Sequence, residues 1–372
     1  MVYLCGAIEG IKYKPKFKLP KLPRYNDLSE GIKHSSSFIY ERSNNKFAVS
    51  WWVSPKRTRS YPYARVYNTL HFSEGKIVTI IPIMKDEGID GDRDFIQWDT
   101  VALMSLLGVY VIIGYYVKAI KNPKYKNKVT NQEFDYKYLE KKFDELSNYR
   151  SDALHWNMNE LSNLKQIGEK ALESYKRISI ETKVIFHDLA SARERIEDVM
   201  SDVNNFKNFS RTLSSKAQYR ESMTRQPKER TYGSKGIIDI KNYLGGLYHF
   251  TVDEVFFNSE KNKVCLIEAK HSKNSVLPSV DDIKDGLLKM ILYTNLKDLY
   301  YISDKQEKIK VNDFTPMLRL TTEKEVNLSN KDRTVLESLL EEARENHFEI
   351  LLNNKKVNNF VNNNLELIDF SC

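Results

Sequence analysis

The sequence has few cysteines and lacks the usual signatures of zinc, nucleotide and secreted proteins. Its cysteines are Cys5, Cys265 and Cys372, without CxxC spacing, which argues against structural zinc and a disulfide framework and fits a reducing cytoplasm. There is no GxxxxGK[ST], HExxH, GxSxG or GxGxxG motif, so an ATP-driven enzyme is not expected. The first residues, MVYLCGAIEGIKYK, lack the basic start and long apolar stretch of a signal peptide. We therefore expect a cytoplasmic protein.

One stretch requires a membrane check. The chain is uncharged from Val101 to Val117, a length at the lower limit for a membrane-spanning helix. Its second half, residues 109–116, is β-branched and aromatic, which favours a buried strand, and Gly108 interrupts the run. We predict a short helix followed by a core strand, and no membrane partner.

Positive charge is concentrated in two places. The chain carries a formal net charge of +8, and residues 206–241 hold nine basic residues against three acids. A second run, residues 12–24, holds six basic residues and no acid. Both runs contain aromatic and hydroxyl residues, a mixture that contacts phosphates and stacks on bases. We therefore expect double-stranded DNA as a partner. The candidate DNA contacts are Arg225, Lys228, Arg230, Lys235 and Lys273.

Composition divides the chain into three segments. Residues 1–130 are expected to form an N-terminal α/β domain that serves DNA recognition or dimerisation. Its expected strands are apolar runs between turn signals: 47–53, 64–72 and 76–84. Residues 131–204 lack proline and show apolar residues at helical spacing, so we expect a helical connector there.

The remaining segment, residues 205–372, is read as the functional core. Its expected strands are residues 248–257, 264–269 and 299–303. Ser279, with Asp282 three residues later, predicts the start of a helix. A closing helix is expected over residues 333–345.

The first two of these strands carry the chemistry. Asp253 lies in YHFTVDEVFF, and Glu268 and Lys270 lie in KVCLIEAKHS. Alternation places Glu268 and Lys270 on one face of their strand, and a hairpin can bring Asp253 beside them. Two neighbouring carboxylates repel unless a divalent cation lies between them, and oxygen ligands favour Mg²⁺. A lysine alongside supplies a fixed positive charge, so the set predicts phosphodiester hydrolysis.

Asp253, fourteen intervening residues and then Glu268-Ala269-Lys270 resemble the PD-(D/E)xK nuclease superfamily. The proline of that motif is replaced by Val252, as in many members. The resemblance implies a restriction-endonuclease-like α/β core, a mixed sheet flanked by helices, with Mg²⁺ as cofactor. Within the superfamily the chain looks like a Type II restriction endonuclease, which implies a homodimer and a cognate DNA methyltransferase as biological counterpart.

Several other residues are weaker candidates. Glu221 is a candidate upstream metal ligand, with a solvated helix residue as the alternative. Glu254 should point away from Asp253, and His271 away from Lys270, while Asp239-x-Lys241 is a competing short motif. For the main set, the structural alternative is an ion-pair ladder on an exposed sheet face.

The N-terminal segment offers candidates for reading bases, namely Trp51, Trp52, Lys56, Arg57 and Arg59. It also contains the acidic loop DEGIDGDRD, which lacks the glycine and glutamate positions of a calcium-binding EF-hand.

Two further functions remain open from the sequence. One is a repair or recombination nuclease that recognises DNA structure instead of sequence. The other is a DNA-binding protein whose nuclease core is inactive.

Overall fold

The computed structural model describes residues 2–56, 59–200, 234–242, 247–258, 263–302, 307–361 and 364–370. The chain forms two compact units, one of residues 1–21 with 224–372 and one of residues 22–223. The first is called the split unit below and the second the inserted unit. This division differs from the three expected segments, because the first strand of the chain joins the C-terminal sheet and the connector helices pack on the N-terminal one.

The inserted unit is built on a five-stranded mixed sheet with the order β2-β3-β4-β5-β8. These strands are β2 (Arg24–Tyr25), β3 (Ser37–Arg42), β4 (Asn45–Trp51), β5 (Lys76–Pro82) and β8 (Tyr110–Gly114). Only β3 and β4 pair antiparallel; the other neighbours are parallel. Two small two-stranded sheets complete its strands: β6 (Met84–Asp86) with β7 (Arg93–Phe95), and β9 (Tyr116–Lys121) with β10 (Val129–Phe134).

The expected strand over residues 64–72 is wrong. Residues Ser60–Tyr67 form helix α2, which buries Tyr63, Ala64, Val66 and Tyr67. Aromatic and β-branched residues suggested a strand, but tertiary burial along one side of a helix outweighs that weak preference. The other two expected strands of this segment are confirmed as β4 and β5.

The apolar stretch 101–117 forms the expected short helix and core strand. Helix α3 (Trp98–Leu106) ends before Gly108, whose φ of +70° suits glycine, and β8 follows with a buried centre. Among the residues that the structure describes, no helix is long and apolar enough to cross a membrane.

Helices dominate the segment expected to be a helical connector. Helix α1 (Leu28–His34) lies near the start of the inserted unit. Beyond α3, the described residues of this unit form α4 (Tyr136–Asn148), α5 (Ala153–Ser162), α6 (Leu164–Thr182) and α7 (Leu189–Met200). Phe143 of α4 packs edge-on against Tyr40 and Phe47 of the sheet. These helices therefore contribute to the sheet's own core.

Helix α5 also covers the open edge of the sheet. Strand β8 is an edge strand, so its outward-facing backbone groups need partners. The Val111 N–H donates to Asn157 Oδ1 at 2.7 Å, and the Trp156 indole N–H donates to the Val111 carbonyl at 2.8 Å. Asn157 Nδ2 donates in turn to the Val109 carbonyl at 3.0 Å. Side chains of α5 thus replace a missing neighbouring strand.

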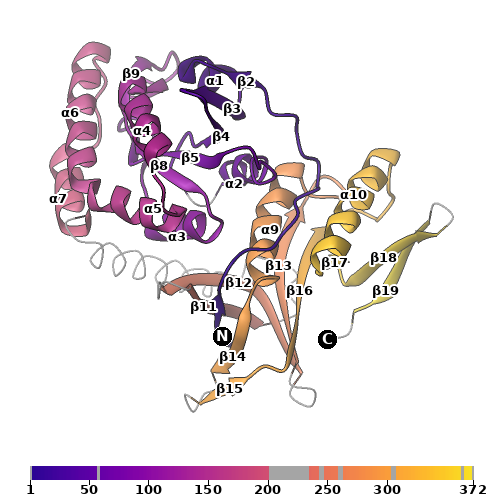
Figure 1. The fold of residues 1–372 in the computed structure, drawn as a ribbon. Coiled ribbons are helices and arrows are strands. Elements are labelled where there is room, and N and C mark those ends of the chain that lie inside the picture. Colours follow the sequence, from indigo (N-terminus) through magenta and orange to yellow (C-terminus); the bar gives the residue numbers. More distant parts are fainter. Residues whose placement is uncertain are drawn as a thin grey trace. The chain divides into compact units, whose positions relative to one another are not determined.

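The split unit contains a ten-stranded mixed sheet with the order β15-β14-β1-β11-β12-β13-β16-β17-β18-β19. Its strands are β1 (Val2–Ile8), β11 (Ser234–Asn242), β12 (Leu247–Asn258), β13 (Lys263–Ser272), β14 (Lys297–Ile302), β15 (Lys308–Lys310), β16 (Asp313–Thr322), β17 (Glu349–Leu352), β18 (Lys355–Val361) and β19 (Asn364–Asp369). Strands β11, β12 and β13 form an antiparallel meander, and β16 is parallel to β13. In Figure 1, α9 (Val280–Tyr293) and α10 (Asn330–Asn346) lie against this sheet.

The predicted elements of this segment are largely confirmed. Strands β12, β13 and β14 occupy the expected positions. Helix α9 begins after Ser279, whose side chain accepts from the Asp282 N–H, and α10 includes the expected closing helix. The strands that were not predicted are β1, β11, β15, β16, β17, β18 and β19.

The basic run at the start of the chain is partly neutralised within the split unit. Lys14 pairs with Glu345 at 2.5 Å, and Lys16 pairs with Glu341 at 3.1 Å. The buried Glu342 accepts from the backbone N–H groups of residues 16 and 17. This segment therefore lies across α10 and is bound to it, and its expected role in contacting phosphates stays a prediction.

The cysteines also depart in part from the expectation of reduced thiols. Cys5 is a free thiol, whereas Cys265 is disulfide-bonded. Cys372 lies outside the described residues.

We predict that Asn157→Ala destabilises the protein by about 2 kcal/mol, because it leaves the buried Val111 N–H without its acceptor. Urea unfolding, monitored by circular dichroism, measures this change. Asn159→Ala on the same helix is the control, since Asn159 is exposed. Equal stabilities of the two variants would contradict the role assigned to Asn157.

Candidate active site

Strand β12 contains a β-bulge at the candidate site. Residues 234–236 of β11 span the same length as residues 252–255 of β12, so β12 has one extra residue in this interval. In this interval β12 contributes two residues, Asp253 and Glu254, opposite the single residue 235 of β11. Bulges re-aim side chains and are over-represented beside active sites. Simple alternation along the strand therefore does not hold at this point.

Asp253, Glu268 and Lys270 lie close together on one side of the sheet. Asp253 Oδ2 accepts from the Ala269 N–H at 2.8 Å, which fixes its carboxylate against β13. Lys270 Nζ lies 3.0 Å from Glu268 Oε1. The prediction that Glu268 and Lys270 share a face of their strand is therefore confirmed. Glu268 is 6% exposed, so the set is not an exposed ladder of ion pairs.

A third carboxylate, which the sequence analysis missed, completes the group. Asp285 of α9 approaches Lys270 Nζ with its Oδ2 at 2.5 Å. Gly286 allows this close approach, because a Cβ there would lie 2.6 Å from Leu318 Cδ1 and 3.3 Å from Lys270 Cε. A glycine inside a helix often marks a close packing contact. In the sequence, Gly286 was therefore the one signal that this part of α9, with Asp285 next to it, lies close to another element.

Burial and charge shift the acid–base properties of this group. Burial, reinforced by the Glu268 charge, raises the pKa of Asp253 from 3.8 to about 7. Burial also raises the pKa of Asp285, although Lys270 opposes that shift. Burial disfavours the charged Lys270, but the charges of Glu268 and Asp285 outweigh it and raise the pKa of the ammonium group. Lys270 therefore stays charged.

Two further α9 side chains face the same carboxylates. Lys289 donates to the Thr251 carbonyl at 3.0 Å, and its charge lowers the pKa of Asp253 somewhat. Burial, followed by the charges of Glu268 and Asp253, raises the pKa of the Tyr293 hydroxyl, which has no hydrogen-bond partner in the structure. Helix α9 thus presents a lysine, an aspartate and a tyrosine to the site.

Asp253 and Glu268 are the residues that would hold a divalent cation. Glu268 Oε2 is buried and has no hydrogen-bond partner, which is costly unless a cation or another polar group satisfies it. Repulsion between the two carboxylates, seen in the raised pKa of Asp253, would be relieved by the same ion. The donor set therefore fits a hard cation. Within the described ranges, no group of three or more His, Cys, Asp or Glu side chains is arranged to hold a metal.

Glu254 lies on the opposite face of the sheet and is not a ligand candidate. Its carboxylate accepts from Arg319 on β16 at 2.6 Å, and both side chains are 1% exposed. Removing one partner of a buried pair of this kind would leave an uncompensated buried charge. His271 bonds Thr321 at 3.0 Å, away from the site as expected.

The other sequence candidates do not join the site. Asp239 bonds His249 on the neighbouring strand. Lys235 and Lys273 are exposed, so both remain available to a partner. Four candidates fall outside the described residues: Glu221, Arg225, Lys228 and Arg230.

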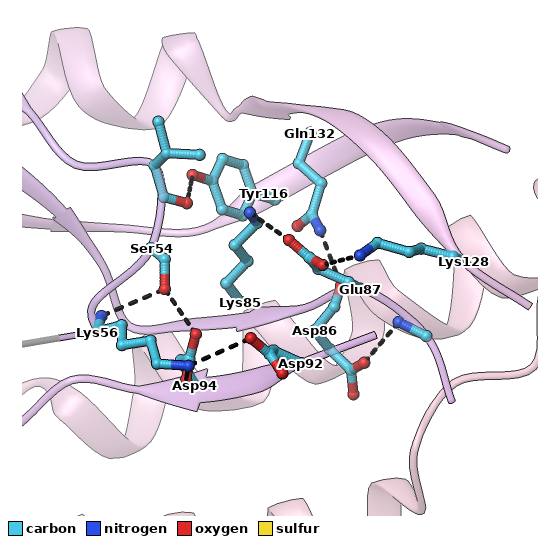
Figure 2. Close-up of polar contacts among 12 residues, drawn as sticks. Ser54, Lys56, Lys85, Asp86, Glu87, Asp92, Asp94, Tyr116, Lys128 and Gln132 are labelled. Carbon is cyan, nitrogen blue, oxygen red and sulfur yellow. Dashed lines mark hydrogen bonds and ion pairs between the residues drawn. The ribbon is translucent and has the colours of Figure 1, made fainter. Parts of the chain in front are cut away.

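In the inserted unit, the candidates for base reading are largely occupied. Trp52 is fully buried, and Lys56 pairs with Asp92 at 3.2 Å. Figure 2 shows the acidic loop bound by its own surroundings, with Asp94 accepting from Ser54 and Glu87 lying between two lysines. Arg57 lies outside the described residues. The polar side chains of this loop are therefore paired with neighbouring residues of the inserted unit.

Comparisons with known proteins do not extend this picture. No protein-family model, curated protein or solved structure matches the chain.

We predict that Asp253→Asn stabilises the cation-free protein at about pH 8 and has little effect near pH 4. A folded-state pKa of about 7 against an ordinary 3.8 means that the folded protein binds more protons between these values. Stability contributed by this group therefore falls as the pH rises through that window. Asparagine cannot ionise, so the variant does not lose this stability. Its unfolding temperature at the higher pH should exceed that of the wild type by roughly several degrees.

Differential scanning calorimetry in a chelating buffer at both pH values checks this expectation. Asp281→Asn is the control, since Asp281 is an exposed aspartate on α9. The assigned pKa would be wrong if Asp253→Asn shifted the unfolding temperature equally at both pH values.

Proposed function

We propose that this protein is a Mg²⁺-dependent endonuclease that hydrolyses phosphodiester bonds of double-stranded DNA at a specific sequence, as a Type II restriction enzyme does. One observation carries the proposal. Asp253, Glu268 and Lys270 come from two adjacent strands and meet in one buried group, with Lys270 Nζ 3.0 Å from Glu268 Oε1. Such charges are costly to bury for stability alone, and perturbed groups of this kind cluster at functional sites.

The chemistry follows from the side chains. Mg²⁺ held by Asp253 and Glu268 would supply Lewis-acid activation at a phosphate. Lys270 places a permanent positive charge where negative charge develops on the phosphate oxygens. Asp253 accepts from the Ala269 N–H, so its second oxygen is left to face a ligand. The partly buried setting excludes water and strengthens each of these interactions.

The sheet order supports the finer proposal of a restriction-endonuclease-like core. The meander β11-β12-β13 is followed by α9 and, after the β14-β15 hairpin, by β16 parallel to β13. This gives the mixed sheet flanked by helices that the sequence resemblance implies. The two active strands lie at its centre, where register is fixed on both sides.

The partners belong to the same proposal. Exposed Lys235 and Lys273, together with Arg225, Lys228 and Arg230, are the proposed contacts to DNA phosphates. A homodimer would cut both strands of a duplex, and a cognate methyltransferase would protect the host sequence. The inserted unit is proposed to contribute sequence recognition or dimer contacts.

The test is digestion of a sequenced plasmid and of phage DNA by the purified protein with millimolar Mg²⁺. We expect discrete fragments that chelation abolishes. Glu268→Gln and Lys270→Met should each slow cleavage by about 100-fold or more, because each removes a charge that acts on the reacting phosphate. Lys308→Met, an exposed lysine on the edge strand β15, is the matched control.

The outcomes separate the proposal from its rivals. Preference for flaps, nicks or junctions over a fixed sequence would favour a repair or recombination nuclease. Tight DNA binding without cleavage at any metal concentration would favour an inactive core. Cleavage by Glu268→Gln and Lys270→Met at the wild-type rate would show that the assigned site is not catalytic.

A further inference from the structure

Lys270 is held by two carboxylates that come from different elements. Glu268 lies on the same strand, two residues away, whereas Asp285 lies on α9. The ammonium group bonds both, at 3.0 Å to Glu268 Oε1 and 2.5 Å to Asp285 Oδ2. The lysine therefore occupies one oxygen of a proposed metal ligand.

This arrangement creates a competition at Glu268. A divalent cation bound at the unpartnered Glu268 Oε2 would repel the nearby ammonium group and weaken its ion pair with Oε1. If Glu268 were the sole partner of Lys270, cation binding would release a long, flexible side chain with several rotatable bonds. A displaced lysine would lose the fixed position that charge stabilisation requires.

Asp285 is a second partner of Lys270 and lies on a different element, α9. It is a short side chain on a helix capped by Ser279 and anchored by the fully buried Ile283 and Leu287. The close contact at Gly286 sets the helix directly against the Lys270 stem. The backbone that carries the Asp285 carboxylate is therefore held by contacts that do not involve Glu268.

We propose that Asp285 is a positioning residue that keeps Lys270 in the site when Glu268 turns to a divalent cation. This inference rests on the proposed function. It assigns Asp285 a role through Lys270 and no contact with the cation. A direct metal ligand at this position, or a purely structural residue, would behave differently in the experiment below.

The experiment follows the Lys270 ammonium group by NMR in protein labelled with ¹⁵N-lysine, using Mg²⁺ as the probe. The Lys270 signal is identified by its absence in Lys270→Met. In the wild type we expect it to shift but persist at saturating Mg²⁺. In Asp285→Asn we expect it to be visible without Mg²⁺ and lost when Mg²⁺ saturates the site. Asp281→Asn, on the same helix, should behave as the wild type.

Calorimetric Mg²⁺ titrations distinguish the alternative roles. In the Lys270→Met background, Asp285→Asn should change the Mg²⁺ dissociation constant by less than about twofold, because a residue that acts only through Lys270 has no effect once that lysine is gone. A loss of affinity about tenfold or more in that background would mean that Asp285 contacts the ion. A lysine signal that persists in Asp285→Asn with Mg²⁺ would overturn the positioning role.

Failure of the proposed function gives a separate result. If Mg²⁺ neither shifts the wild-type signal nor produces heat on titration, the metal-dependent function falls, and the positioning role falls with it. If the wild type responds and only the contrast with Asp285→Asn is missing, the positioning role alone is wrong. Unfolding temperatures of each variant verify that it is folded. If Asp285→Asn is unstable, Asp285→Glu serves in its place. This variant keeps the charge, so we expect it to retain the Lys270 signal with Mg²⁺.

Discussion

The site depends on enclosing three carboxylates and one ammonium group within a few ångströms on a mostly buried sheet face. Each carboxylate tolerates this environment only because Lys270, Lys289 or a backbone N–H compensates part of its charge. Compensation is incomplete, as the raised pKa values of Asp253 and Asp285 show. Additional positive charge would therefore stabilise the ionised carboxylates of this group.

The other face of the same strands meets an opposite requirement. There Glu254 and Arg319 neutralise each other beside Phe256 and Phe370, whose rings lie 5.9 Å from the guanidinium carbon. The two adjacent acids of β12 therefore differ in their surroundings. The charge of Asp253 is only partly compensated by its neighbours, whereas Glu254 pairs with Arg319. The bulge between β11 and β12 lies where these two residues separate.

Much of the split unit could be predicted because its signals are local. The Ser279 cap, the apolar face of α9 and the period-two pattern around Glu268 each depend on neighbouring residues. Asp285 could not be assigned in this way, since its role arises from a contact between α9 and β13 that local spacing does not specify. Helix α2 was mistaken for a strand because aromatic and β-branched residues serve both structures once they are buried.

Long-range pairing was the other obstacle. Strand β1 pairs with β11 and β14, more than two hundred residues later in the chain, and no local pattern in VYLCGAI identifies such partners. Likewise, the basic run after it suggested nucleic acid, and two of its lysines, Lys14 and Lys16, pair with glutamates of α10. Net charge along a sequence does not reveal which charges the fold itself neutralises.

The position of β1 between β14 and β11 has a consequence for biosynthesis. This strand is synthesised before β11 and β14 and cannot pair with them until both have left the ribosome. The inserted unit, by contrast, is one continuous segment, residues 22–223, so it can fold while the rest of the chain is still being made. Until then β1 must wait with its backbone unpaired, and closing the large sheet around it should be the slow step of maturation, because contacts distant in sequence form late.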